Sequence, residues 1–180
     1  MTRQQITLAA MAALSAASLA ACNKPAPATA VDTGKISDAV KADVHQLVVD
    51  FNAHDVDKAV SHDAPGMVGM FHGAPNVVGP EQDKALTTQQ IAASPNAAIA
   101  VSDESVDVAA AGDMAIYRAT YAFTATDPKT KAPMAEHGNW VVGYKPAADG
   151  SWKIAWNVIS DTPAPTPAAS SAPASSAPSP

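Results

Sequence analysis

The sequence predicts an α+β domain in which helices come first and pack on one face of a curved antiparallel sheet. Two observations support this prediction. Between residues 36 and 60 the apolar side chains recur every three or four positions, as they do on one face of a helix. After residue 96 they alternate with polar side chains, which is typical of half-buried strands. The region with these patterns, 36–161, is long enough to form a single hydrophobic core.

Three helices are expected in the first part of this region. The first covers 36–52, with Ser37 as its N-cap and an apolar stripe of Ile36, Val40, Val44, Leu47, Val48 and Phe51. Asp55 begins a second, shorter helix that ends before Pro65. The third helix starts at Gly79-Pro80-Glu81, with proline in the first turn and an acid near the positive helix end, and runs to about Ala93.

The strands follow from period-two alternation and from turn signals between the alternating runs. A short early strand is expected at 67–71, followed by four long strands at 97–108, 113–126, 136–145 and 151–160. Asp149-Gly150 marks the last hairpin turn. In the last strand, strict alternation puts Trp152, Ile154 and Trp156 on one face and Ala155, Asn157 and Ile159 on the other. Both faces are therefore apolar, and we expect a homodimer through the sheet face that the helices leave open.

The two ends of the chain differ from this region. Residues 1–21 combine Arg3 with a short uncharged apolar run, as in a secretory signal, and the run is shorter than the ~20 residues that cross a bilayer. Residues 22–35 and the Pro/Ala/Ser-rich segment 162–180 lack large apolar side chains, so we expect a mobile tether and a disordered tail.

The only cysteine of the chain, Cys22, directly follows the apolar run. Leu19-Ala20-Ala21-Cys22 resembles the bacterial lipobox, which implies acylation of Cys22 and anchoring in the cell envelope, facing the periplasm. Asn23 in the next position, by the same resemblance, favours the outer membrane over the inner one. The alternative is ordinary secretion with cleavage near Ala20 and a free thiol.

Composition excludes several classes of function. With 17 acidic and 11 basic residues the net charge is −6, which does not suit a protein that binds nucleic-acid phosphates. One cysteine cannot form an internal disulfide or a cysteine zinc site. The five histidines match no HExxH pattern, and no nucleotide-binding loop is present, so the sequence predicts neither a metal nor a cofactor. We expect His45, His54 and His62 to face solvent.

The order of the expected helices and strands, together with several short motifs, resembles that of the nuclear transport factor 2-like superfamily. The resemblance is greatest to its SnoaL-like and ketosteroid isomerase-like groups. The resemblance rests on 51–55 at the end of the first helix, 76–81 before the third helix, Gly112-Asp113 and 149–154. It implies a cone-shaped half-barrel with a pocket between sheet and helices, commonly in a dimer.

The catalytic groups of ketosteroid isomerase do not carry over. That enzyme uses an aspartate base with a tyrosine and a protonated aspartate. In that enzyme the base lies on the first short strand or the turn after it, and the corresponding residues here, 67–72, include no carboxylate. The position of the protonated aspartate corresponds to Trp140 or its neighbour Asn139, neither of which is an acid. The first helix has no tyrosine. His72 is the remaining candidate for a general base. Alternatively, it is only a residue of the turn that ends the strand.

By the same resemblance, one sheet face lines the pocket with Tyr117, Ala119, Tyr121, Phe123, Trp140, Val142 and Asn157. Such walls suit a small apolar ligand. Alternatively, these rings fill a closed core, or the opposite face with Arg118, His137 and Asn139 lines the pocket and the ligand is anionic.

The sequence thus favours a lipid-anchored, noncatalytic SnoaL-like domain that binds a small apolar ligand or acts as a dimeric interaction module. The alternatives are an isomerase, cyclase or hydrolase with His72 as base, and a structural module with a filled pocket.

Overall fold

The computed structural model describes residues 30–162. The elements are α1 (Thr33–Asn52), α2 (Val56–Val60), β1 (Asp63–Phe71), β2 (Val77–Val78), α3 (Pro80–Ala93), β3 (Ala98–Val108), β4 (Ala115–Thr126), β5 (Pro133–Pro146) and β6 (Trp152–Asp161). The expected signal segment, Cys22 and nearly all of the expected tail lie outside the described residues. Among those that are described, no helix combines the length and the apolar character needed to cross a membrane.

Side-chain caps set the helix boundaries. Asp32, and not the expected Ser37, caps α1, because its carboxylate accepts the Lys35 backbone N–H at 3.1 Å. Asp55 caps α2 in the same way, accepting the N–H of Lys58. Gly79 precedes Pro80 at the start of α3, as expected from the sequence.

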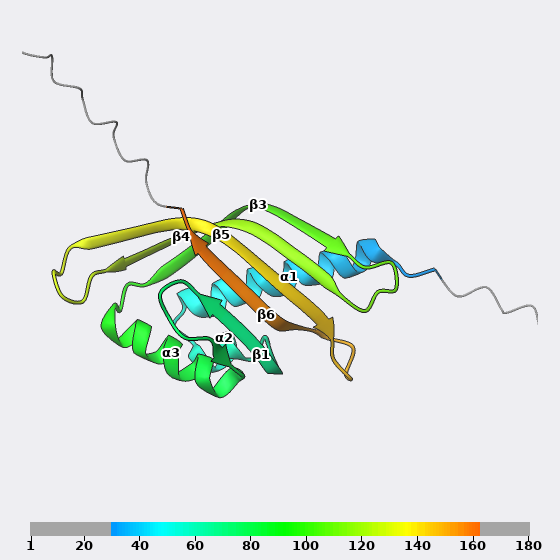
Figure 1. The fold of residues 1–180 in the computed structure, drawn as a ribbon, viewed down its shortest axis with the longest axis horizontal. Coiled ribbons are helices and arrows are strands. Elements are labelled where there is room, and N and C mark those ends of the chain that lie inside the picture. Colours follow the sequence, from blue (N-terminus) through cyan, green and yellow to red (C-terminus); the bar gives the residue numbers. More distant parts are fainter. Residues whose placement is uncertain (1–29, 163–180) are drawn as a thin grey trace, which may run out of the picture. The chain divides into compact units, whose positions relative to one another are not determined.

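The strands form one six-stranded sheet in the order β2-β1-β6-β5-β4-β3. Strands β3 to β6 form the expected antiparallel meander (Figure 1). The sheet is antiparallel except at one pair, since β1 runs parallel to β6. Strand β1 also starts at Asp63, earlier than expected, and the two-residue strand β2 was not expected.

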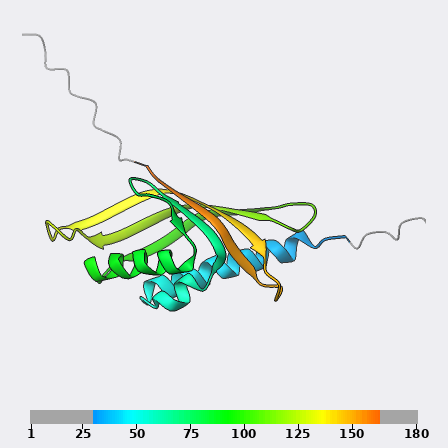
Figure 2. The ribbon, with the colours of Figure 1, turned by 60° about the horizontal axis from the view of Figure 1, so that its bottom comes forward.

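All three helices lie on the same side of the sheet (Figure 2). The core between the two layers includes Val40 and Val44 of α1, and Tyr117, Val142 and Tyr144 of the sheet, all fully buried. Asn52 fixes the end of α1 to β3, because its amide both donates to the carbonyl of Ile99 and accepts from its N–H. The fold is therefore the expected α+β arrangement of helices on a curved sheet.

A β-bulge interrupts the alternation expected for the last strand. Ile154 pairs with Tyr144 and Trp156 pairs with Gly143, so Ala155 is an extra residue in β6. As a result Ile154 and Asn157 both face the helices, and Trp156 lies on the opposite face over Gly143. The strict alternation expected for β6 was wrong for this reason. The homodimer through the outer face stays a prediction.

Candidate functional site

A cavity of about 490 Å³ lies between α3 and the helix-facing side of the sheet. Its apolar walls come from both layers and consist mainly of Leu47, Phe51, Phe71, Leu86, Ile99, Phe123, Met134, Ile154 and Ile159. Cavities in this size range accommodate small organic molecules. The space is far larger than the ~30 Å³ of a single water molecule. The side chains of the helices and the sheet therefore do not fill the space between the two layers.

The expected pocket residues lie on the helix-facing side of the sheet. Tyr121, Phe123, Trp140 and Asn157 line the cavity. Tyr117 does not, because it is fully buried in the core beside Trp140, and its hydroxyl donates to Glu104 at 3.0 Å. Burial and this hydrogen bond raise the pKa of Tyr117 above its ordinary value.

The alternative with the opposite sheet face as the lining is excluded by burial. Arg118, His137 and Asn139 are exposed on the side of the sheet away from the helices. Arg118 forms an ion pair with Asp107 on that face. None of these three side chains lines the cavity, so they do not support the alternative of an anionic ligand.

Three side chains in the lining carry a buried polar atom with no hydrogen-bond partner. They are Asp63 Oδ2, Trp140 Nε1 and Asn157 Oδ1, in side chains of residues that are no more than 9% exposed. Buried polar atoms in native proteins are nearly always paired, and an unpaired one costs roughly 1–3 kcal/mol. A bound molecule with polar groups would satisfy them.

Asp63 and Asp83 bring two carboxyl groups together at one end of the cavity. Asp63 begins β1 and Asp83 lies in the first turn of α3, so two elements packed on each other carry the pair. Burial, followed by the charge of Asp83 and the contact with it, raises the pKa of Asp63 to about 8. Burial also raises the pKa of Asp83. The two groups therefore share a proton at neutral pH.

Sequence reasoning missed this pair. The strand expected at 67–71 holds no carboxylate, but β1 starts earlier, at Asp63. A first-turn acid such as Asp83 is ordinary at a helix N-terminus, and 20 residues separate it from Asp63. The signal that could have been used is the polar pair His62-Asp63 directly after a helix, followed by an alternating run.

His72, the candidate base, lies at the exposed edge of the cavity lining. Its Nδ1 is 3.5 Å from Asp161 Oδ1 and 3.8 Å from Glu136 Oε1, and its side chain is 47% exposed. Tyr121 donates its hydroxyl to the same Glu136 carboxylate. Burial and that hydrogen bond raise the pKa of Tyr121. Within residues 30–162 no group of three or more histidine, cysteine or acidic side chains is arranged to hold a metal ion.

Solved structures with the same arrangement of helices and sheet were found by comparison of coordinates. A ketosteroid isomerase-like protein from Erwinia carotovora atroseptica superposes with a TM-score of 0.59 at 19% identity, over 70% of this chain and 96% of that one. An NTF2-like superfamily protein from Salmonella enterica serovar Typhimurium gives 0.65 at 10% identity, over 76% and 97%. The fold is NTF2-like.

The likeness extends to an NTF2-like protein with a cystatin-like fold from Novosphingobium aromaticivorans, with a TM-score of 0.57 at 12% identity over 68% of this chain and 79% of that one. No protein-family model and no curated protein matches the sequence. At these identities the comparisons establish the NTF2-like fold, the curved half-barrel expected from the sequence.

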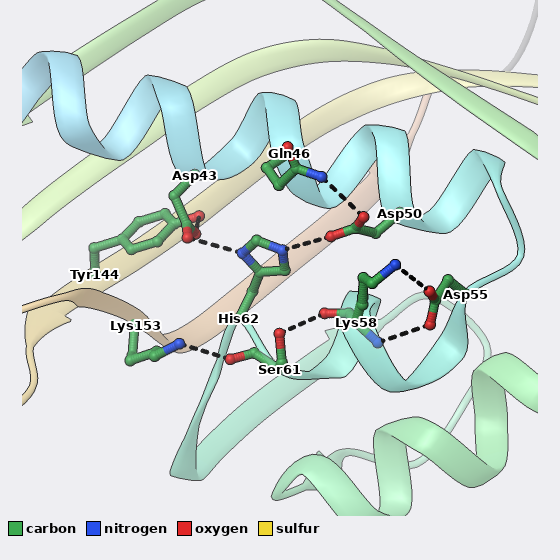
Figure 3. Close-up of polar contacts among 9 residues, drawn as sticks. All are labelled: Asp43, Gln46, Asp50, Asp55, Lys58, Ser61, His62, Tyr144 and Lys153. Carbon is green, nitrogen blue, oxygen red and sulfur yellow. Dashed lines mark hydrogen bonds and ion pairs between the residues drawn. The ribbon is translucent and has the colours of Figure 1, made fainter.

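A second polar cluster lies beside the cavity, inside the NTF2-like domain (Figure 3). His62 Nδ1 is 2.8 Å from Asp43 Oδ1, and its Nε2 is 3.3 Å from Asp50 Oδ2. Tyr144 donates its hydroxyl to Asp43 at 2.9 Å. The expectation that His62 faces solvent was wrong, since it is 7% exposed.

The other two histidines are closer to that expectation. His45 has a side chain that is 58% exposed and contacts Glu104 at 2.9 Å. His54 is half-buried and hydrogen-bonds the carbonyl of Ala97 at 3.0 Å. The first contact joins α1 to β3, and the second joins the residues after α1 to the residue before β3. These histidines therefore stabilise the scaffold and do not line the cavity.

Proposed function

We propose that this NTF2-like domain binds a small, largely apolar molecule in the cavity under α3. The observation that carries the proposal is the set of three unpartnered buried polar atoms on Asp63, Trp140 and Asn157, in a lining that is otherwise mostly apolar. Apolar walls supply affinity, and a few fixed polar groups supply orientation. A packed structural module would have neither the open volume nor the unpaired atoms.

Nile red, a neutral apolar dye whose fluorescence rises on leaving water, is a direct probe of this cavity. We expect saturable binding to the purified protein. Ala93 lines the cavity at the end of α3, so Ala93→Trp should fill part of the opening and weaken dye binding roughly tenfold or more, since steric exclusion removes apolar contact area. Fluorescence titration gives both affinities.

The matched control is Ala92→Trp, at an exposed neighbouring position that does not line the cavity. It introduces the same side chain on the same helix and should leave dye binding unchanged. Equal loss in both variants, or no saturable binding of either Nile red or the smaller neutral probe 1-adamantanol to the unaltered protein, would contradict the proposal.

A catalytic role for His72 is the second candidate. It is favoured by one observation, the position of the imidazole in the cavity lining within 4 Å of the carboxylates of Glu136 and Asp161. A carboxylate that contacts one ring nitrogen orients the ring. In this reading His72 would transfer a proton to or from a ligand in the same cavity, so the binding proposal holds for both candidates.

We further propose that Cys22 anchors the protein in the cell envelope, on the strength of the lipobox resemblance alone. Replacement of Cys22 by alanine removes the only acylation site, so the variant should move from the membrane fraction to the soluble periplasmic fraction. Ser18→Ala, within the same apolar run, should stay with the membranes and serves as the control. Retention of the Cys22→Ala protein in the membrane fraction would contradict anchoring.

A further inference from the structure

The polar groups of the cavity lining are mostly acidic, and no lysine or arginine side chain of residues 30–162 contributes a cation to it. The lining contains the carboxyl groups of Asp63, Asp83 and Glu136 and the imidazole of His72, but no lysine or arginine among the described residues. Glu136 accepts the Tyr121 hydroxyl and lies near His72. Asp63 and Asp83 have only each other, because two carboxyl groups form a hydrogen bond only when they share a proton.

The basic groups nearest to Asp63 are held by other partners. His62, the preceding residue, is engaged by Asp43 and Asp50. Lys153 approaches from β6, but its Nζ donates to the backbone carbonyl of Ser61 at 2.7 Å (Figure 3). Their charges favour ionisation of Asp63, yet burial and Asp83 outweigh them. Among the described residues, therefore, no basic side chain forms a salt bridge with either carboxyl group of the pair.

Resting on the cavity binding proposed above, we propose that the ligand is a small apolar amine, and that the carboxyl groups of Asp63 and Asp83 bind its ammonium group. Asp63 is more than nine-tenths buried and keeps Oδ2 free of any donor, which is what an N–H group of the ligand would satisfy. Asn157 Oδ1, equally buried in the same lining, is a second unpartnered acceptor.

The rest of the lining suits the same class of ligand. Aromatic rings of Phe51, Phe71, Tyr121 and Trp140 surround the cavity, and such rings attract ammonium groups as well as apolar carbon. A charge-assisted hydrogen bond from an ammonium group to a buried carboxylate is roughly twice as strong as a neutral one. A carboxylate on the ligand would instead meet two or three acids, so an anionic ligand is disfavoured.

Binding of an ammonium group displaces the proton that the pair shares. In solution the amine carries its own proton, and Asp63, whose pKa is raised to about 8, holds a proton at neutral pH. Once the ammonium supplies the positive charge, both carboxyl groups ionise and the shared proton leaves to the solvent. Affinity should then rise about tenfold per pH unit below the pKa of the pair and level off above it.

The test compares 1-adamantylamine with 1-adamantanol, which share one rigid carbon skeleton and differ only in the polar group. Isothermal titration calorimetry of the purified full chain at pH 7, in buffers of different ionisation enthalpy, gives affinity and proton count together. We expect the amine to bind at least about tenfold more tightly, with release of close to one proton, and the alcohol to bind without proton release.

Asp83→Asn removes one charge and the shared proton while keeping the shape of the side chain. The variant should lose most of the preference for the amine and release less than one proton, because burial alone still raises the pKa of Asp63, but it should still bind 1-adamantanol. Glu81→Gln removes one charge from the same helix turn at an exposed position outside the lining, so it should behave like the unaltered protein. Should Asp83→Asn fail to fold, Asp63→Asn tests the same point.

The outcomes separate this inference from the binding proposal. Equal affinities of amine and alcohol without proton release would overturn the amine inference and leave cavity binding intact. Loss of amine preference in Glu81→Gln as well as in Asp83→Asn would also overturn it, because long-range charge and not the carboxyl pair would be the cause. Absence of binding for both probes would overturn both proposals.

Discussion

Alanine in place of Gly143 should destabilise the domain by about 2 kcal/mol. Gly143 lies inside β5, and the ring of Trp156 on β6 covers it on the outer face of the sheet. A Cβ at this position would lie 2.1 Å from the Trp156 ring, far inside van der Waals contact. The ring must leave its place, so the outer face loses buried apolar surface. Urea denaturation followed by circular dichroism measures the change in the free energy of unfolding.

The cause can be isolated with Trp156 removed. In a Trp156→Ala background nothing occupies the space over Gly143, and alanine is intrinsically better than glycine inside a strand by roughly 0.5–1 kcal/mol. Gly143→Ala should therefore be neutral or stabilising in that background. The reversal of sign is a strong coupling between two contacting residues.

Gly66 provides the control for this experiment. It also lies in a strand, but a Cβ there would meet no atom within 4 Å. Gly66→Ala should leave the free energy of unfolding unchanged or slightly raised. An equal loss of stability for Gly143→Ala with and without Trp156 would contradict the steric explanation.

Regular alternation made the strand assignments possible. In β4 the residues from Ala115 to Ala125 alternate strictly between buried and outward positions, so the face that carries Tyr121 and Phe123 could be predicted from the sequence. In β6 the bulge at Ala155 breaks the period, and no local pattern announces it. Sequence alternation therefore placed Ile154 on the same face as Trp156, whereas Ile154 lines the cavity.

Long-range contacts account for what sequence reasoning missed in the site. Asp63 and Asp83 each have an ordinary local interpretation, at a strand start and in a first helical turn, and only the packing of α3 on β1 brings them together. His62 is similar. It is a polar residue after a short helix, and its two partners lie on α1. Candidate aromatic residues were predictable because they share one strand face, whereas the acids required the tertiary structure.

The cluster around His62 has the burial and geometry of a structural ion network. Its imidazole bridges two carboxylates that lie about two turns apart on α1, while Tyr144 and Gln46 donate to their remaining oxygens (Figure 3). Burial disfavours the charged imidazole, but the hydrogen bonds and charges of Asp43 and Asp50 outweigh burial and raise the pKa of His62. These contacts favour the protonated form of His62, and its imidazole joins α1 to the residues at the start of β1.

His62→Ala should cost about 3 kcal/mol of stability near pH 6, because it leaves two carboxylates without their cation in a largely buried site. A histidine whose pKa is raised by folding contributes fully below its unfolded pKa of ~6.5 and loses that contribution as pH rises through the folded value. The difference in the free energy of unfolding between the two proteins should thus shrink from pH 6 to pH 9. Urea denaturation at each pH measures it.

His45→Ala is the matched control, since His45 also contacts a carboxylate but is mostly exposed. Exposed pairs contribute roughly 0–1 kcal/mol, so this variant should stay close to the unaltered protein at every pH. A loss for His62→Ala no larger than that for His45→Ala would contradict a structural role for the cluster. A loss that grows with pH would instead mean that neutral His62 is the stabilising form, and the assignment of the charge to the histidine would have to be reversed.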